Sequence, residues 1–555
     1  MHSTQTKTLG EPLMAVDALS RRLTPATSLP PKRENRRVGL FYFLWLGEHG
    51  RGGPYDISKM VAEDPAIGHH PESEKWGGVG VYHHWGEPFY GYYCSNDEWV
   101  IRRHMKLFIQ AEIDFLFFDT TNAIIYENNA KTVLRVLQEY HDEGWRIPKV
   151  MFYTNSSSGR TVDALLDRIY RPRYCPDTWF CPDTWFCLGE KPVVIADPQD
   201  CSAEAREFFD IKLSQWPNEQ DKAGGWPWMD FTRPQRVFTD LCGNPETINV
   251  SVAQHPQLRF GDSVLYGETE NCGRAFHDGH NDPAPDAYLH GYNFAEQFDR
   301  AIEADPPIVL VTGWNEWIAG RWEGIPERPI MFVDCASTEY SRDIEMMRGG
   351  YFDNYYMQLV DYVRRYKGAD NCPAGDQSGP RVYDGFRDGG FPRHAEGYGG
   401  KIYENRTAQN VLLRLRVSHD ETHLTVEMDT LDPVTPYSAD GAWMRLYLNV
   451  SGGRGYDYVV NTRPVGDDRC AIARVATNGD DLTAEEIETA HAEITRRENG
   501  ITLRIPRAAV GLDRDGFTLW LKAADATRPY QTVADFYDLG VALPLGRLNF
   551  VYSAC

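Results

Sequence analysis

Short apolar runs alternate with amphipathic helical stretches over the first two thirds of the chain. Apolar runs predict strands at residues 38–45, 114–119, 150–153, 192–197, 248–254 and 308–312. Helical spacing of apolar positions predicts helices at residues 99–111, 130–144, 162–170 and 293–304. Apolar strands that alternate with helices are typical of a parallel sheet covered by helices. A segment of roughly 330 residues with seven or eight such strands favours an α/β fold with a closed (β/α)₈ TIM barrel over an open sheet.

The hydrophobic period changes near residue 380. Beyond that point apolar and polar residues alternate, as in Leu413–Val417 and His423–Met428, and Asn499-Gly500 predicts a tight hairpin turn. This alternation predicts a C-terminal antiparallel β-sandwich. A stretch rich in Gly, Pro and Asp precedes it and predicts a linker. We therefore expect four segments, which are a flexible or wrapping arm at 1–36, a barrel at 37–367, a linker at 368–381 and a sandwich at 382–555.

Charge and aromatic content narrow the class of partner. The chain has 555 residues and a formal charge of −23, and an acidic surface repels phosphate backbones, which argues against nucleic acid. Aromatic residues make up 13% of the chain, with 15 Trp and 30 Tyr. Rings in this number suit a protein that stacks against flat ligands, although the cores of barrels and sandwiches use them as well. A poly- or oligosaccharide is the partner that this composition favours.

A direct CPDTWF repeat contains three of the eleven cysteines, Cys175, Cys181 and Cys187. Their spacing differs from the C-x₂-C pairs of zinc sites, so we interpret the repeat as a duplicated surface loop, and we expect neither a metal nor another cofactor. No apolar stretch has the length of a membrane span, and the N-terminus shows no signal-peptide run. As written, the chain is expected in the cytoplasm, while a trimmed or mis-assigned start would allow a periplasmic or secreted protein. The oligomeric state stays open.

Two carboxylates stand at the ends of predicted strands. Asp119 ends one strand, and Asn315-Glu316 follows another. In barrels of this kind the carboxyl ends of the strands form the active site. Cleavage of a glycosidic bond passes through an oxocarbenium-like state and uses a pair of carboxyl groups, so Glu316 is the first catalytic candidate and Asp119 the second. The alternative for Glu316 is a structural ion pair with an arginine such as Arg321.

Rings and polar groups accompany these carboxylates along the sequence. Two Trp flank the Asn-Glu pair, and the segment Tyr82–Tyr90 presents four ring-bearing residues before a Gly-Glu-Pro turn. Two adjacent histidines in that segment could bind a metal, but neighbouring side chains in a loop point apart, which favours a sugar subsite. The predicted substrate-binding residues are Trp45, His83, His84, Trp85, Asn122, Arg274, His277, Trp314, Asn315, Trp317 and Arg321.

The runs GLFYFLWLG, HHW, SNDEWVIRRHM and TGWNEW occur in this order between residues 37 and 367. In order and spacing they resemble the endo-α-mannosidase family, glycoside hydrolase family 99, and its bacterial family 71/99-like or WbsX-like relatives. The resemblance implies a (β/α)₈ barrel that hydrolyses α-linked glycans. It also implies that Glu316 acts as a base on the sugar 2-hydroxyl, through an epoxide-like intermediate and with net retention.

The C-terminal segment resembles family 9-like carbohydrate-binding modules. The matching stretches are Leu424–Asp429, Leu446–Val450 and Gly455–Asn461. The resemblance implies a domain that either binds glycan or supports the barrel.

One position departs from the family pattern. The family places a second Glu three residues after the first as its acid/base, and this chain has Ala319 there. The acid is then expected from Glu323, which is nearest in sequence, or from Asp119, which is better placed by topology. We expect a glycosidase of endo or exo type, and the alternative is a non-catalytic glycan-binding protein on a degenerate barrel. A sugar-transferring protein is a third possibility, although no G-x-G-x-x-G motif follows a strand.

Overall fold

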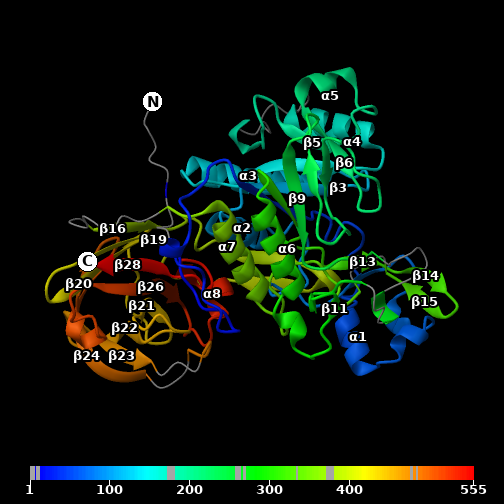
Figure 1. Cartoon of the computed structure of the whole chain (residues 1–555). Coiled ribbons are helices and arrows are strands. Elements are labelled where there is room, and N and C mark those ends of the chain that lie inside the picture. Colours follow the sequence, from blue (N-terminus) through cyan, green and yellow to red (C-terminus); the bar gives the residue numbers. More distant parts are fainter. Residues whose placement is uncertain are drawn as a thin grey trace.

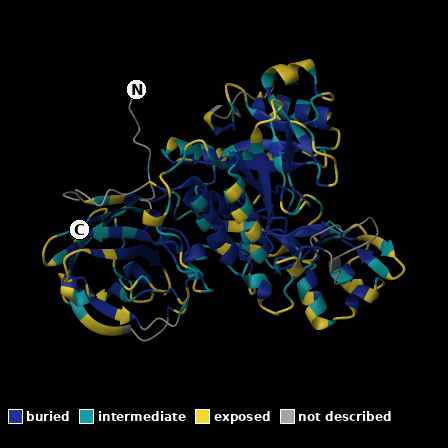
Figure 2. Cartoon of the chain, in the orientation of Figure 1, coloured by how far each residue is buried: buried dark blue, intermediate teal, exposed yellow. Residues whose placement is uncertain are grey.

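The computed structural model describes residues 7, 13–171, 182–256, 264–266, 271–332, 336–370, 380–475, 479–482 and 486–554. The chain forms an α/β part and a separate antiparallel β part, which lie side by side (Figure 1). Buried positions follow the central strands and the inner helix faces, and exposed positions lie on outer helices and loops (Figure 2). Cys175, Cys181 and most of the predicted linker lie outside the described residues.

A nine-stranded sheet forms the core of the α/β part. Its strands are β1 (Arg37–Tyr42), β3 (Phe115–Thr120), β4 (Lys149–Thr154), β5 (Val193–Ala196), β6 (Asp210–Gln215), β7 (Gly225–Pro227), β8 (Val237–Thr239), β9 (Pro245–Ser251) and β12 (Ile308–Thr312). They are ordered β7-β6-β5-β4-β3-β1-β12-β9-β8, and all neighbours are parallel except β8, which is antiparallel to β9. The Gly224 N–H donates to the Thr239 carbonyl at 2.8 Å, so the two edges meet and the sheet is nearly closed. The prediction of a mixed α/β fold around a parallel, barrel-like sheet is confirmed at this level.

Helices cover the outside of this sheet. They are α2 (Glu98–Gln110), α3 (Glu127–Asp142), α4 (Ser158–Leu165), α5 (Ala203–Phe208), α6 (Tyr292–Ala304) and α7 (Asn354–Lys367). The Asp97 carboxylate accepts from the Val100 N–H and so begins α2 where the apolar period starts. The described residues 216–244 contain no helix, so β6, β7 and β9 follow one another without the helical crossovers of a regular (β/α)₈ repeat.

The interior of the barrel-like sheet is filled by alternate residues of its strands. Phe41, Phe115, Phe117 and Tyr153 belong to one buried apolar cluster, and the Phe41 and Phe117 rings stack at 4.7 Å. Because side chains of a strand alternate between its two faces, Asp119 continues the inward-facing series of Phe115 and Phe117. The sequence period therefore directs this carboxylate into the carboxyl end of the sheet.

Eleven described strands of the antiparallel part form one continuous sheet, and β17 (Arg393–Glu396) and β18 (Ile402–Asn405) form a separate two-stranded sheet. The eleven strands are β16 (Arg381–Asp384), β19 (Leu412–His419), β20 (His423–Thr430), β21 (Ala442–Asn449), β22 (Tyr458–Pro464), β23 (Arg469–Val475), β24 (Glu486–Arg497), β25 (Gly500–Pro506), β26 (Phe517–Ala526), β27 (Val541–Leu543) and β28 (Phe550–Ala554). Ile494 pairs with Leu503 across the predicted Asn499-Gly500 turn. The antiparallel class is confirmed, but the division into the two facing sheets of a sandwich is not, because the strands form one continuous hydrogen-bonded sheet.

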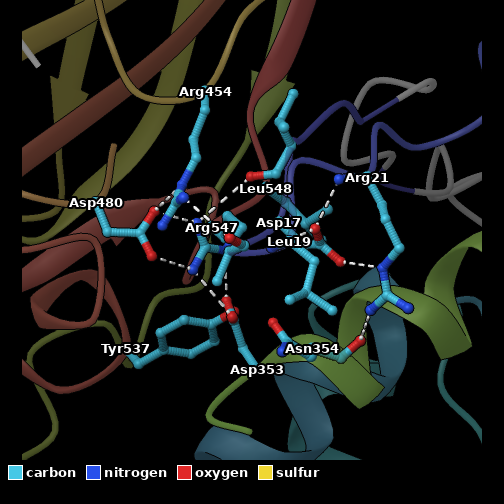
Figure 3. A network of polar contacts seen from close by, with 12 residues as sticks. Asp17, Leu19, Arg21, Asp353, Asn354, Arg454, Asp480, Tyr537, Arg547 and Leu548 are labelled. Atoms are coloured by element: carbon cyan, nitrogen blue, oxygen red, sulfur yellow. Dashed lines mark hydrogen bonds and ion pairs between the residues drawn. The ribbon is translucent and has the colours of Figure 1, made fainter. Parts of the chain in front are cut away.

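A buried guanidinium joins the two parts (Figure 3). Arg547 of the antiparallel part donates to Asp353, just before α7, at 2.7 and 3.0 Å, and to Asp480 at 2.6 and 2.9 Å. Arg454 and the Tyr537 hydroxyl add hydrogen bonds to these two carboxylates. The side chains of Arg547 and Asp353 are 4% and 0% exposed, so this network is desolvated and its pairing is needed for stability.

The described part of the N-terminal arm lies along the same joint. The backbone groups of Met14 and Asn549 exchange hydrogen bonds at 2.9 and 2.8 Å. Arg454 donates to the Ala18 carbonyl, and Arg21 donates to the carbonyls of His290 and Asn354. Residues 13–36 therefore connect the antiparallel strands with the helices of the α/β part.

Candidate active site

Glu316 lies just beyond the carboxyl end of β12 and is 8% exposed. Its Oε2 accepts a hydrogen bond from Nη2 of Arg342, which is fully buried. The segment that carries Arg342 runs beside the end of β12, because Gly313 donates to the Arg342 carbonyl at 3.0 Å and Ile344 donates to the Gly313 carbonyl at 3.1 Å. The predicted alternative of an ion pair is thus present, with Arg342 in place of Arg321.

Asp119 is 5% exposed at the end of β3 and accepts a hydrogen bond from the Thr121 N–H at 3.1 Å. Burial raises the pKa of Asp119 above its ordinary value, while the Thr121 bond and the charge of Arg342 act in the opposite direction. Arg342 therefore interacts with both candidate carboxylates. An opposite charge at hydrogen-bond distance favours the ionised form of Glu316, and desolvation favours the protonated form of Asp119.

Aromatic side chains that the sequence analysis missed lie next to this pair. The Arg342 guanidinium stands over the Trp228 ring at 5.2 Å, and the Trp216 ring meets Trp228 edge-on at 5.4 Å. Both Trp rings are partly exposed, at the ends of β7 and β6. Nδ1 of His255 lies 3.4 Å from Arg342. The sequence signals for Trp216 and Trp228 were weak, because the strands β6 and β7 that precede them have no continuous apolar run. Only the Trp-Pro-Trp triplet at 226–228 indicates these rings in the sequence.

Trp45 and Asn122 reach one cluster from two different strands. The partly exposed Trp45 ring contacts the rings of His49 and Tyr82 at 5.4 and 5.9 Å. Both His49 Nε2 and Asn122 Nδ2 lie within hydrogen-bond distance of the Tyr126 hydroxyl, at 3.0 and 2.5 Å. This cluster offers rings and hydrogen-bond groups to solvent, as a sugar subsite requires.

The two Trp of the TGWNEW motif are core residues. Trp317 is fully buried and stacks on Trp85 at 4.4 Å, and Trp314 packs edge-on against Phe108 at 4.6 Å. Their predicted role in substrate binding is wrong for this conformation, because no ring face reaches solvent. Asn315 has a structural contact as well, since its amide exchanges hydrogen bonds with both backbone groups of Phe43 and so fixes the end of β1.

His83, His84, Trp85 and Arg274 are also buried. Burial lowers the pKa of His83 to about 4 and that of His84 to about 3, which keeps both rings neutral among aromatic neighbours. Arg274 is enclosed by two Tyr rings at 4.4 Å and donates to the Asp343 carbonyl at 2.8 Å. These four side chains are enclosed by protein in this structure, and their predicted contacts with a sugar stay predictions.

Two buried acids, Asp343 and Glu345, accept hydrogen bonds from the segment that contains Glu316. Asp343 accepts from the Glu316 N–H and from Trp85 Nε1, and burial raises the pKa of Asp343 to about 7. Glu345 accepts from the Trp317 Nε1 at 2.5 Å and from the Tyr93 hydroxyl at 2.7 Å. The sequence analysis did not predict this role, because the segment around Arg342 has neither a helical nor a strand period.

The remaining candidates lie elsewhere. Glu323 is exposed on a hairpin of β14 (Trp322–Ile325) and β15 (Arg328–Met331), and Arg321 donates to the Pro71 carbonyl at 2.6 Å. His277 lies on the short β10 (Phe276–His277), where it contacts two aspartates. Ala319 pairs with His83 in the ladder of β13 (Ile318–Gly320) and β2 (Tyr82–His84), so the family's acid/base position belongs to a short β-ladder here.

We expect Trp317→Ala to lower the free energy of unfolding by about 3–5 kcal/mol, because it removes a fully buried ring and leaves a cavity beside Trp85. The matched change Trp216→Ala removes a partly exposed ring and is expected to cost less than about 2 kcal/mol. Denaturant unfolding of both variants measures the difference. Equal losses would contradict the assignment of Trp317 to the core.

Among the described residues, no group of three or more His, Cys, Asp and Glu side chains is arranged as a metal site. The same part of the chain contains no helix with the length and apolar character needed to cross a lipid bilayer.

No protein-family profile matches the sequence, and no curated protein is significantly similar to it. Two solved structures of the GH99 endo-alpha-mannosidase from Bacteroides thetaiotaomicron, one of them in complex with bis-tris-propane, share 15% identity with a TM-score of 0.34. The alignments cover 60% of this chain and 97% and 99% of those chains. A glycoside hydrolase-like protein shares 12% identity with a TM-score of 0.29, over 61% of this chain and 96% of the other. At these TM-scores the likeness carries no inference about the present chain.

Proposed function

We propose that this chain is a glycoside hydrolase that cleaves an α-linked poly- or oligosaccharide at the carboxyl end of its parallel sheet. The observation that carries the proposal is the pair Glu316 and Asp119, which both interact with Arg342 beside the partly exposed Trp228. Glycosidases need two carboxyl groups whose environments differ, so that one is ionised and the other is protonated. Rings next to such a pair give a sugar a stacking surface.

The environments assign a role to each carboxyl group. Glu316, paired with Arg342, is the base or nucleophile, because the guanidinium stabilises its negative charge. Asp119 is the acid that protonates the leaving oxygen, because burial raises its pKa. Trp216 and Trp228 hold the sugar ring, and the cluster of Trp45 and Asn122 forms a neighbouring subsite. Glu323 has no part in this proposal, because it lies on an exposed hairpin.

The experiment is a product-size assay of the wild type on a panel of α- and β-linked glycans. We expect new reducing ends and shorter products from at least one α-linked glycan. Cleavage of β-linked glycans alone would contradict the linkage. Binding of oligosaccharides without any cleavage would instead support the second candidate, a glycan-binding barrel, which is favoured by the use of Glu316 in an ion pair and by Ala319 at the family's acid position.

If Asp119 is the acid, activity falls as the pH rises through its folded-state pKa, because only the protonated form donates. We expect Asp119→Asn to lower kcat on a natural glycan by about 10²–10⁴-fold. An aryl glycoside with a good leaving group needs no protonation, so its hydrolysis is expected to survive and to lose the alkaline decline. The pH profiles of both substrates measure this, and equal losses on both would contradict the acid role.

The antiparallel part is proposed to bind glycan as an accessory domain. Its single continuous sheet gives no separate support for a family 9-like module, so this role stays a prediction.

A further inference from the structure

A cavity of about 340 Å³ lies between the α/β part and the antiparallel part. None of the residues of the Glu316 site lines it. Helix α2 contributes Trp99 and Arg103 to its wall. The other wall comes from the antiparallel part and includes Phe391, Asn405 and Arg406. The volume falls in the range of sites for small ligands.

Arg103 is the unusual feature of this cavity. It is 6% exposed, and within the described part of the chain its guanidinium makes neither a hydrogen bond nor an ion pair. The guanidinium lies over the Trp99 ring, at 4.6 Å from its centroid. Because the Arg103 guanidinium has no carboxylate partner among the described residues, it is available to a negatively charged group that enters the cavity.

Neighbouring cations show how this fold treats its other buried charges. Arg102 forms ion pairs with Glu98, Glu139 and Asp388, at 2.6, 2.6 and 2.9 Å. Lys106, one helical turn from these residues, pairs with Asp388 at 2.7 Å. Arg393, which follows the lining residue Pro392, pairs with Asp97 at 2.7 Å. Unlike these three neighbours, Arg103 has no carboxylate partner among the described residues, and it lines the cavity.

The charged residues that line the cavity are all positive. It includes two arginines, Arg103 and Arg406, and no Asp or Glu, in a chain of net charge −23. The charge of Arg103 acts on Asp538, whose pKa burial raises to about 6, but no ion pair joins the two side chains among the described residues. A local positive charge in an acidic protein is what a bound anion requires.

We propose that this cavity binds the carboxylate of a small acidic ligand of the size of a uronic-acid monosaccharide. The planar guanidinium fork of Arg103 matches the two oxygens of a carboxylate. Phe391, whose ring is partly exposed, gives the body of the ligand an apolar wall. Asn405 and Thr407 also line the cavity, and hydrogen bonds to each other and to the backbone hold their side chains in place. The site is independent of the proposed hydrolase activity, because no residue of the Glu316 site lines it.

Isothermal titration calorimetry with D-glucuronate tests the proposal on the full chain. We expect millimolar or tighter binding by the wild type, at least about tenfold weaker binding by Arg103→Met, and no binding of neutral glucose. Arg103→Lys keeps the charge but loses the fork, and is expected to fall between the two. Arg514→Met, an exposed change of equal charge in the antiparallel part, is the matched control and is expected to bind as the wild type does.

Equal affinities of the wild type and Arg103→Met would overturn the site. So would the absence of glucuronate binding by the wild type, or binding of glucose as tight as that of glucuronate. Binding of inorganic sulfate in place of glucuronate would overturn the carboxylate assignment. Circular dichroism of each variant shows whether it is folded. If Arg103→Met is unfolded, the affinity of Arg103→Lys is compared with that of the wild type instead.

Discussion

Glu316→Gln lowers kcat on the best α-linked glycan by about 10²–10⁴-fold, with the fold intact. The amide has the shape of the carboxylate and can still accept the hydrogen bond from Arg342, but it carries no charge to stabilise an oxocarbenium-like state and is a poor base. Initial rates of reducing-end formation, with affinity measured separately by calorimetry, provide the test. We expect oligosaccharide affinity to change by less than the rate does.

The matched control is Glu323→Gln, which makes the same chemical change on the exposed β14–β15 hairpin. It is expected to keep wild-type activity. The reverse result, an active Glu316→Gln and an inactive Glu323→Gln, would move the catalytic carboxylate to the hairpin and refute the site described above. Thermal unfolding of both variants shows whether a lost rate reflects lost structure.

Arg547→Met is expected to lower the free energy of unfolding by about 3–5 kcal/mol, because it leaves two carboxylates without their shared cation. Asp353 is fully buried, so its charge has no access to water once Arg547 is gone. Denaturant unfolding is the measurement. Limited proteolysis is a second readout, since loosening of the joint is expected to expose the region between the two parts.

The control is Arg454→Met, which removes the more exposed partner of Asp480 and leaves the buried pair in place. Its expected cost is below about 1 kcal/mol. If both variants lose the same free energy, the buried pair with Asp353 is not what holds the joint.

The pH dependence of this joint has a definite sign. Burial acts to raise the pKa of Asp480, but the hydrogen bonds and charges of Arg547 and Arg454 outweigh it and hold that pKa far below its ordinary value. A depressed folded-state pKa gives stability that is present above the unfolded pKa of about 3.9 and is lost as the pH falls. The difference between wild type and Arg547→Met is therefore expected to shrink as the pH falls below about 4.

Local pattern determined the secondary structure of the α/β part. The apolar runs at β1, β3, β4, β9 and β12 were visible because strands buried on both faces are continuously apolar. The helical period located α2 in the same way. The short strands β6, β7 and β8 were not predicted from the sequence, because they contain few consecutive apolar residues. They form by pairing with neighbouring strands.

The sequence also selected the two carboxylates, since both Asp119 and Glu316 follow strands and both interact with one arginine in the folded chain. The sequence could not show which of the neighbouring Trp rings are buried and which are exposed. Trp317 and Trp228 are alike as residues, yet one is fully buried and the other partly exposed. Which ring faces solvent depends on what packs against it, and that partner, Trp85 for Trp317, is far away along the chain.

The sequence by itself thus predicted the longer apolar strands and helices, the parallel α/β and antiparallel classes of the two parts, and two candidate acids, because these depend on periods and strand ends that are local. Only the tertiary structure decided that Arg342 is the partner of Glu316, that one antiparallel sheet is continuous, and that Arg103 faces a cavity without a carboxylate. Each of these depends on contacts between residues distant in sequence, where burial and the loss of water decide which charges must be paired.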